Sequence, residues 1–237
     1  MEGPDRVKFA GLILDFDGVL LESEYAGNAQ IAEFLTREGH PTTPEQAMEH
    51  FMGLSGPAFR AAIERWIRRP LPESFHEARA QEDARVLAEG LEAVAGAIAF
   101  VEALPPDLPR AVASSSAPEW IERHLGHLGI RRHFGDLVFS GARHVARGKP
   151  APDIYHHAAE AMGVPIERIA IVEDSPVGVR GALASGATVI GLCAGRHCLP
   201  GHAERLRALG VEHVAGSFEE VAGLLGLHRD PKAGGRS

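Results

Sequence analysis

Phe9-Ala-Gly-Leu-Ile-Leu-Asp15-Phe-Asp17-Gly18 is the stretch of this sequence that decides its fold. The run 9–14 is short and mostly apolar, which is typical of a strand that is buried on both faces of a sheet. Asp15 and Asp17 follow where this strand should end, and in an open parallel sheet ligands bind at that carboxyl edge. Two neighbouring carboxylates repel each other, and Mg²⁺ neutralises such acidic clusters through oxygen ligands. An acidic turn that closes a strand is the alternative interpretation.

A second apolar run, 109–113, ends in Ser114, Ser115 and Ser116, and a helical pattern follows over 117–128. At the end of a strand, the Ser114 hydroxyl can donate a hydrogen bond to a phosphate, as can the amides that open the helix. The alternative is that Ser115 or Ser116 only caps this helix.

Two later segments add a lysine and a second pair of acids. Gly148-Lys149-Pro150-Ala-Pro152-Asp153 presents a compact positive charge on a turn whose prolines limit the backbone, although a surface lysine before a helix is the alternative. Another apolar strand, 168–172, delivers Glu173 and Asp174 to its carboxyl end, and Pro176 suits the first turn of the next helix. Acids, hydroxyl and lysine at the ends of different strands are the groups that phosphoryl transfer requires.

These motifs resemble those of the haloacid dehalogenase (HAD) superfamily, in the group that contains β-phosphoglucomutase and small sugar-phosphate phosphatases. They occur in the order of that family and span residues 9 to about 195. The matching segments are Asp15-Phe-Asp17-Gly18-Val19, Ser114, Lys149-Pro150-Ala-Pro152-Asp153 and Val172-Glu173-Asp174-Ser175-Pro176-Val-Gly178. The resemblance implies an α/β fold with a doubly wound parallel sheet, a HAD-like Rossmannoid core, and an inserted α-helical cap.

The pattern of apolar residues agrees with this organisation. Residues 22–90 predict consecutive helices without an intervening strand, and strands then alternate with helices as far as residue 192. We therefore expect a core domain at 1–20 and 92–228, a helical cap domain at 21–91, and a disordered tail at 229–237. The expected cap helices are 22–39, 44–52, 57–69 and 73–89, and the expected strands after the cap are 109–113, 137–140, 168–172 and 187–192. The expected later helices are 94–104, 117–128, 151–163, 177–185, 202–209 and 217–226.

Composition excludes several classes of function. The 237-residue chain has a formal net charge of −8 and no basic stripe, which argues against nucleic acid as a principal partner. Cys193 and Cys198, its two cysteines, make no disulfide framework, so a reduced, intracellular location fits better. No apolar stretch has the length of a membrane span or a targeting segment, so we expect a cytoplasmic protein with no membrane partner. A monomer is the expected state, and a dimer stays open.

The thirteen histidines suggest no metal site in the sequence. His124 and His127 lie on one predicted helix, and His156 and His157 lie on another. None of these has a carboxylate partner at metal-ligand spacing, so we expect all four on solvated helix faces.

The resemblance assigns roles to the motif residues. Asp15 is the candidate nucleophile, which forms an aspartyl-phosphate, and Asp17 is the candidate general acid and base. Mg²⁺ would be held by Asp15, the backbone carbonyl of Asp17, and Asp174, with Glu173 close. Ser114 and Lys149 would hold the transferring phosphoryl group, helped by backbone amides after Asp15 and at Ser115. The acid at Asp17 also separates this chain from the dehalogenases, which characteristically lack an acid two residues after the nucleophile.

Two positions favour a phosphatase over a mutase. Ala26 stands where the related mutases carry a cap histidine, and Gly56 stands where they carry an arginine for the second phosphate of the substrate. Met52 replaces a lysine that is often found before the cap glycine. Arg60 lies one turn further along and is either a substitute or a surface residue. We therefore expect a Mg²⁺-dependent phosphatase, with a β-phosphoglucomutase-like mutase as the alternative.

A helical cap limits access to small leaving groups. The expected substrate is therefore a small phosphate monoester, such as a sugar phosphate or a sugar-acid phosphate. A non-catalytic, phosphometabolite-binding regulatory protein on the same fold is the alternative from another class of function.

Overall fold

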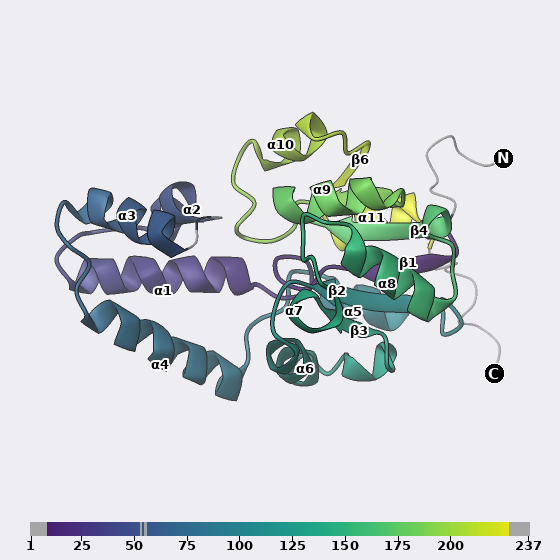
Figure 1. The fold of residues 1–237 in the computed structure, drawn as a ribbon, viewed down its shortest axis with the longest axis horizontal. Coiled ribbons are helices and arrows are strands. Elements are labelled where there is room, and N and C mark those ends of the chain that lie inside the picture. Colours follow the sequence, from purple (N-terminus) through teal and green to yellow (C-terminus); the bar gives the residue numbers. More distant parts are fainter. Residues whose placement is uncertain (1–8, 53, 55, 228–237) are drawn as a thin grey trace, which may run out of the picture.

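The computed structural model describes residues 9–52, 54 and 56–227. Its centre is a six-stranded parallel sheet with the strand order β3-β2-β1-β4-β5-β6. Figure 1 shows this sheet beside the group of helices that follows β1 in the sequence. This arrangement confirms the predicted doubly wound α/β fold. The strands are β1 (Gly11–Leu14), β2 (Arg110–Ser114), β3 (Val138–Ser140), β4 (Ile169–Glu173), β5 (Thr188–Leu192) and β6 (His213–Ala215).

Side chains of β1 alternate between two hydrophobic layers, because successive residues of a strand point to opposite faces. Leu12 and Leu14 belong to one buried cluster, and Ile13 belongs to the other. The first layer contains residues of α5 (Ala97–Ala103), α6 (Pro118–His127) and α11 (Phe218–Leu224). The second contains residues of α8 (Asp153–Met162), α9 (Pro176–Ser185) and α10 (His202–Ala208). Strand β1 is therefore buried on both faces, as its apolar sequence predicts.

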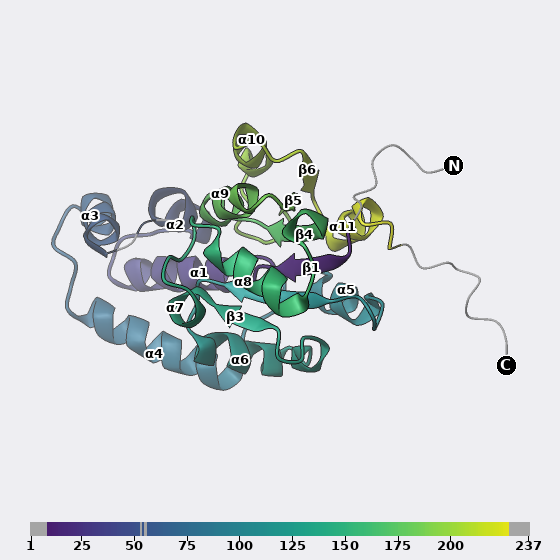
Figure 2. The same ribbon diagram turned by 45° about the vertical axis from the view of Figure 1, so that its right-hand side comes forward.

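The central position of β1 places the site. Leu14 pairs with Val112 of β2 on one side and with Val172 of β4 on the other. Because all three strands run in parallel, their carboxyl ends share one edge of the sheet. Figure 2 shows the strands pointing toward the helices that follow β1 in the sequence.

Those helices are α1 (Ser23–Arg37), α2 (Pro44–Phe51), α3 (Gly56–Ile67) and α4 (Ser74–Glu89). Their buried residues, Phe34 and Ile63 among them, form a hydrophobic cluster separate from those of the sheet. Helix α2 begins with a capping box in which Thr43 and Gln46 each accept a hydrogen bond from the backbone N–H of the other. The separate cluster supports the predicted division into a core (1–20 and 92–228) and a cap (21–91), which we keep as a proposal.

The chain passes between sheet and cap twice, and the two passages are hydrogen-bonded to each other. Leu21 forms an antiparallel bridge with Ala93. The backbone N–H of Glu22 donates to Glu92 O (3.0 Å), and that of Val94 donates to Leu20 O (3.1 Å). The helices α1–α4 are thus joined to the sheet through one paired segment.

The observed elements lie close to their predicted bounds, with a few additions. Strand β6 and the short helices α7 (Gly141–His144), η1 (Arg131–His133) and η2 (Ile166–Arg168) were not predicted. The predicted tail 229–237 lies outside the described residues. None of the helices in the described part of the chain combines the length and apolar character that crossing a bilayer requires.

One predicted surface residue is buried. His124 on α6 is fully buried, and its Nδ1 lies 2.9 Å from Trp120 O. The expectation of a solvated position is wrong for His124 because α4 packs against α6 and covers it. His127 and His156 are exposed, and His157 is half-buried.

Candidate active site

A buried ion pair joins the motif at the end of β1 to the Lys149 segment. The backbone N–H of Asp15 donates to Val172 O on β4 (3.0 Å), which fixes Asp15 at the carboxyl edge. Lys149 Nζ lies 2.6 Å from Asp15 Oδ1, and the lysine side chain is only 4% exposed. Its burial excludes the alternative of a surface lysine.

Glu173 shares the same lysine. Its Oε1 accepts hydrogen bonds from Lys149 Nζ (2.7 Å) and Tyr155 Oη (3.0 Å). Its Oε2 accepts from the backbone N–H groups of Asp174 (2.9 Å) and Ser175 (3.0 Å). Both oxygens are thus satisfied within the protein, in a side chain that is fully buried. These contacts support a role for Glu173 in holding Lys149 and the turn into α9.

Asp174, in contrast, keeps one oxygen free. Its Oδ2 lies 2.7 Å from His197 Nε2, whereas its buried Oδ1 has no hydrogen-bond partner among the described residues. Carboxylate oxygens of Asp15, Glu173 and Asp174 lie within 4.8 Å of one another. An unpartnered carboxylate oxygen beside two further buried carboxylates fits a hard divalent cation such as Mg²⁺.

The charges of the cluster agree with this fit. Burial and the neighbouring Glu173 raise the pKa of Asp15 well above its ordinary value, although Lys149 acts in the opposite direction. Burial, Glu173 and Glu24 likewise raise the pKa of Asp174. Burial would lower the pKa of Lys149, but Asp15 and Glu173 outweigh it and the net shift is upward. One ammonium therefore leaves three buried carboxylates short of positive charge, and a dication would supply it.

Asp17 lies in a polar cage apart from this cluster. Its Oδ1 accepts hydrogen bonds from Ser23 Oγ (2.7 Å) and Trp120 Nε1 (3.1 Å). Its Oδ2 accepts from Ser116 Oγ (2.6 Å) and Ser114 Oγ (3.3 Å). Because Ser23 belongs to α1 and the others to the segment around β2 and α6, both the cap and the core hold this carboxylate.

The serine contacts also decide how α6 begins. Its N-cap is Ala117, and no side chain caps it, so the alternative of a capping Ser115 or Ser116 is wrong. The Ser114 hydroxyl accepts the backbone N–H of Ser116 (3.0 Å) instead. Ser115 is exposed toward the cavity described next.

A cavity of about 790 Å³ opens between the sheet edge and the helices α1–α4. The predicted residues that line it are Asp15, Asp17, Ser114, Ser115, Lys149 and Asp174. Glu173 is the one predicted site residue that does not line it. The cap contributes apolar Phe51, Met52, Leu54 and Phe59 and polar Glu24, Asn28 and Arg79.

Several site residues carry no signal in the sequence. Ser23 and Trp120 reach Asp17 from helices that only the tertiary structure brings together. The position of Ser116 after a predicted strand suggested only a helix cap and not a contact with Asp17. His197, which contacts Asp174, lies outside all four motifs.

Comparison with known proteins agrees with this geometry. A model of the haloacid dehalogenase-like hydrolase family matches residues 9–186. The chain belongs to this family. The match covers the sheet edge with its two acid pairs, Ser114 and Lys149, and it confirms the HAD resemblance on which the roles of the motif residues rest.

Three relatives in the HAD family are informative. The 6-phosphogluconate phosphatase of Escherichia coli (strain K12) is 29% identical over 195 residues, which cover 81% of this chain and 86% of that protein. A HAD family hydrolase from Deinococcus radiodurans R1, solved with bound phosphate and sodium, is 30% identical with a TM-score of 0.82, covering 93% of this chain and 97% of that chain. A putative β-phosphoglucomutase from Thermotoga maritima is 25% identical with a TM-score of 0.69, covering 92% and 99%. Together they confirm the predicted group, and the family and its phosphatase relative confirm the predicted class of phosphoric monoester hydrolase.

Proposed function

We propose that this HAD-family hydrolase is a Mg²⁺-dependent phosphatase that acts on a small phosphorylated metabolite, a sugar phosphate or sugar-acid phosphate, through an aspartyl-phosphate on Asp15. The observation that carries the proposal is the convergence of Asp15, Asp17, Ser114, Lys149 and Asp174 on one cavity. The named activity of the Escherichia coli relative supports the class of substrate.

Asp15 and Lys149 supply the nucleophile and its charge balance. The carboxylate oxygen of Asp15 attacks phosphorus, the bond to the leaving oxygen breaks, and an acyl phosphate forms on Asp15. Lys149, 2.6 Å from Asp15, favours the ionised carboxylate against the cost of burial. Bound Mg²⁺, held by Asp15, Asp174 and the backbone carbonyl of Asp17, would neutralise the charge of the phosphoryl oxygens. The Ser114 hydroxyl and the backbone amide of Ser115 then hold the phosphoryl group at the sheet edge.

Asp17 acts as the general acid and the general base. As a general acid it gives a proton to the leaving alkoxide, and as a general base it then takes one from the water that hydrolyses the acyl phosphate. Ser23 donates to Asp17 from the cap helix α1, so the position of this carboxylate depends on the position of the cap.

The Asp17→Asn variant should lose about 10²- to 10⁴-fold in kcat toward alkyl phosphates, the usual contribution of a general acid or base. The loss in the first step should be far smaller for p-nitrophenyl phosphate, because its leaving group needs no proton. Rapid-mixing kinetics should then show a burst of p-nitrophenolate equal to the enzyme, followed by slow turnover. Equal loss of the first step with both kinds of ester would exclude Asp17 as the acid.

The size of the cavity suits a metabolite, since sites for small molecules range from about 300 to 1,000 Å³. Its polar cap residues, Glu24, Asn28 and Arg79, can bind hydroxyl or acidic groups of the leaving part, and Phe51 and Phe59 cover the apolar side.

The decisive test is a panel of phosphorylated metabolites incubated with and without Mg²⁺, including 6-phosphogluconate, hexose 1- and 6-phosphates, and pentose phosphates. Release of inorganic phosphate from a small ester only in the presence of Mg²⁺ is the expected result. Isomerised sugar phosphate without released phosphate would identify a mutase. A folded, Mg²⁺-binding protein that converts nothing in the panel would favour the regulatory binder.

Ala26 and Arg60, the candidate substitute for the arginine absent at Gly56, give the mutase little support. Ala26 does not line the cavity, and Arg60 is exposed and hydrogen-bonded to His76 Nε2 (2.8 Å) on α4. Arg60 is therefore unsuited to a second phosphate, and Arg79 is the cap arginine that does line the cavity.

A further inference from the structure

Two histidines that follow β5 hold Asp174 at two different points. His197, in the loop 193–201, is 2% exposed, and its Nε2 donates to Asp174 Oδ2 at 2.7 Å. His202, the first residue of α10, is 4% exposed, and its Nε2 lies 2.7 Å from the backbone O of Asp174. A carbonyl oxygen only accepts, so this nitrogen of His202 carries the hydrogen. One imidazole therefore fixes the side chain of Asp174 and the other fixes its backbone.

These two contacts leave Asp174 Oδ1 as the free oxygen. It is buried and has no partner in the described part of the chain. A carboxylate that binds a metal through one oxygen is commonly held by a hydrogen bond to the other, and Asp174 has this arrangement.

The backbone around the contact makes room for the imidazole. Gly18, with φ +82°, approaches the Asp174 carboxylate so closely that a Cβ there would overlap Oδ2. A Cβ at Gly195 would overlap the His197 ring. Glycines on both sides thus allow His197 to lie against Asp174, because any larger residue would displace one of them.

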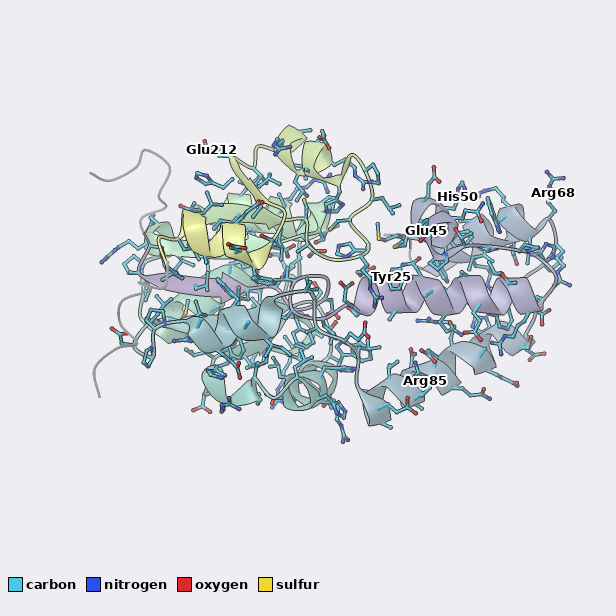
Figure 3. All side chains as sticks on the ribbon, turned by 180° about the vertical axis from the view of Figure 1, so that it is seen from behind. Tyr25, Glu45, His50, Arg68, Arg85 and Glu212 are labelled. Atoms are coloured by element: carbon cyan, nitrogen blue, oxygen red, sulfur yellow. The ribbon has the colours of Figure 1, made fainter. Side chains whose placement is uncertain are left out.

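The loop that carries His197 is itself fastened to the start of the cap. Both carboxylate oxygens of Glu22 accept the backbone N–H of Arg196 at 3.1 Å. The Arg196 guanidinium lies over the Tyr25 ring, 4.1 Å from its centroid, and donates to Glu92 Oε2 at 2.8 Å. Figure 3 shows Tyr25 at the end of α1 nearest the core. The loop is therefore held by Glu22, Tyr25 and Glu92 in addition to the contact of His197 with Asp174.

The cluster His197, Cys198 and His202 also resembles the donor set of a soft metal ion. The Nε2 atoms of both histidines, however, contact Asp174: His197 Nε2 contacts its Oδ2, and His202 Nε2 contacts its backbone O. His202 Nδ1 lies 3.2 Å from Arg205, and His197 Nδ1 is buried without a partner in the described part of the chain. The nitrogens that face Asp174 are therefore engaged by Asp174 and are not available to a second ion.

We propose that His197 and His202 are positioning residues for the metal ligand Asp174. They hold its carboxylate so that Oδ1 faces the ion, and they act through Asp174 without touching the substrate phosphate. This inference rests on the proposed Mg²⁺-dependent function, because it assigns Asp174 to the metal.

The test measures Mg²⁺ itself. Isothermal titration of Mg²⁺ into metal-free protein should show binding about 10- to 100-fold weaker in His197→Ala than in the wild type, the usual effect of removing such a supporting contact. The Mg²⁺ concentration for half-maximal hydrolysis of p-nitrophenyl phosphate should rise by the same factor, while kcat at saturating Mg²⁺ changes much less. His197→Asn should recover part of the affinity, because its amide can still donate to Oδ2.

Two control variants show whether a loss of Mg²⁺ affinity is specific to the contact of His197 with Asp174. His133→Asn removes a histidine whose Nε2 is also buried, in η1 and away from the cavity, and should leave Mg²⁺ affinity unchanged. Asp174→Asn should weaken binding at least as much as His197→Ala. Wild-type affinity in a folded His197→Ala, with folding checked by circular dichroism, overturns the positioning role. A wild-type protein that binds no Mg²⁺ would instead overturn the proposed function, and this inference with it.

Discussion

The Asp15→Asn variant is expected to lose at least about 10⁴-fold in kcat on every substrate of the wild type, the scale of loss when a catalytic nucleophile is removed. The neutral amide cannot attack phosphorus to form an acyl phosphate. Asparagine has nearly the same shape, and the backbone bond from Asp15 N to Val172 O is unchanged, so the fold should persist. The measurement is steady-state phosphate release, with thermal unfolding to verify the folded state.

Intact-protein mass spectrometry adds a direct readout. Wild-type protein quenched in acid during turnover should carry the mass of one phosphoryl group, and Asp15→Asn should carry none. Asp136→Asn, the same substitution at an exposed aspartate outside the cavity, should behave as the wild type in both assays. If Asp15→Asn kept a tenth of wild-type activity, another residue would have to be the nucleophile.

The Lys149→Met variant should lose both activity and stability. Methionine has a similar length but no charge, so it leaves Asp15 and Glu173 buried beside each other without their shared partner. Removing one member of a buried charged set costs about 3–5 kcal/mol of unfolding free energy. Urea unfolding measures that loss, and kcat should fall by about 10³-fold or more because the phosphoryl group also loses its cation.

A second substitution separates the two effects. The double variant Lys149→Met with Glu173→Gln also removes the unpaired negative charge of Glu173. Most of the lost unfolding free energy should therefore be recovered, while activity stays low. Arg147→Met, two residues earlier on the same segment but 73% exposed, should change neither quantity appreciably. Recovery of activity in the double variant would show that Lys149 serves only to neutralise Glu173.

The fold was predicted well where the apolar runs were clear and where Gly, Pro or acidic residues marked their ends. Asp15, Ser114 and Asp174 each follow or end a buried strand, so a parallel sheet with these residues at its carboxyl edge could be predicted from the apolar pattern and the resemblance. The order of the strands in the sheet was not predicted. Strand β6 escaped prediction because its three residues, His213–Ala215, are too short for a period to be seen and are stabilised by pairing with β5.

The parts that could not be predicted depend on contacts between distant segments. The burial of His124 depends on α4 packing against α6, and the cage of Asp17 depends on Trp120 and Ser23 approaching from different helices. His197 has no motif around it, and its contact with Asp174 arises because β4 and β5 are neighbours in the sheet. Carboxylate oxygens of Glu173, Asp15 and Asp174 lie within 4.8 Å of one another. The hydrogen bonds of Glu173 to Lys149 and Tyr155 join distant segments of the chain and could not be predicted.

The pairing of the two chain passages at Leu21 and Ala93 limits how the cavity can be opened. If the two chain passages were not paired, the helices α1–α4 could slide and twist relative to the sheet. The backbone hydrogen bonds of Glu22 and Val94 join the two passages, so we expect them to bend together and not independently. Any movement of α1–α4 that widened the cavity would therefore bend both passages together.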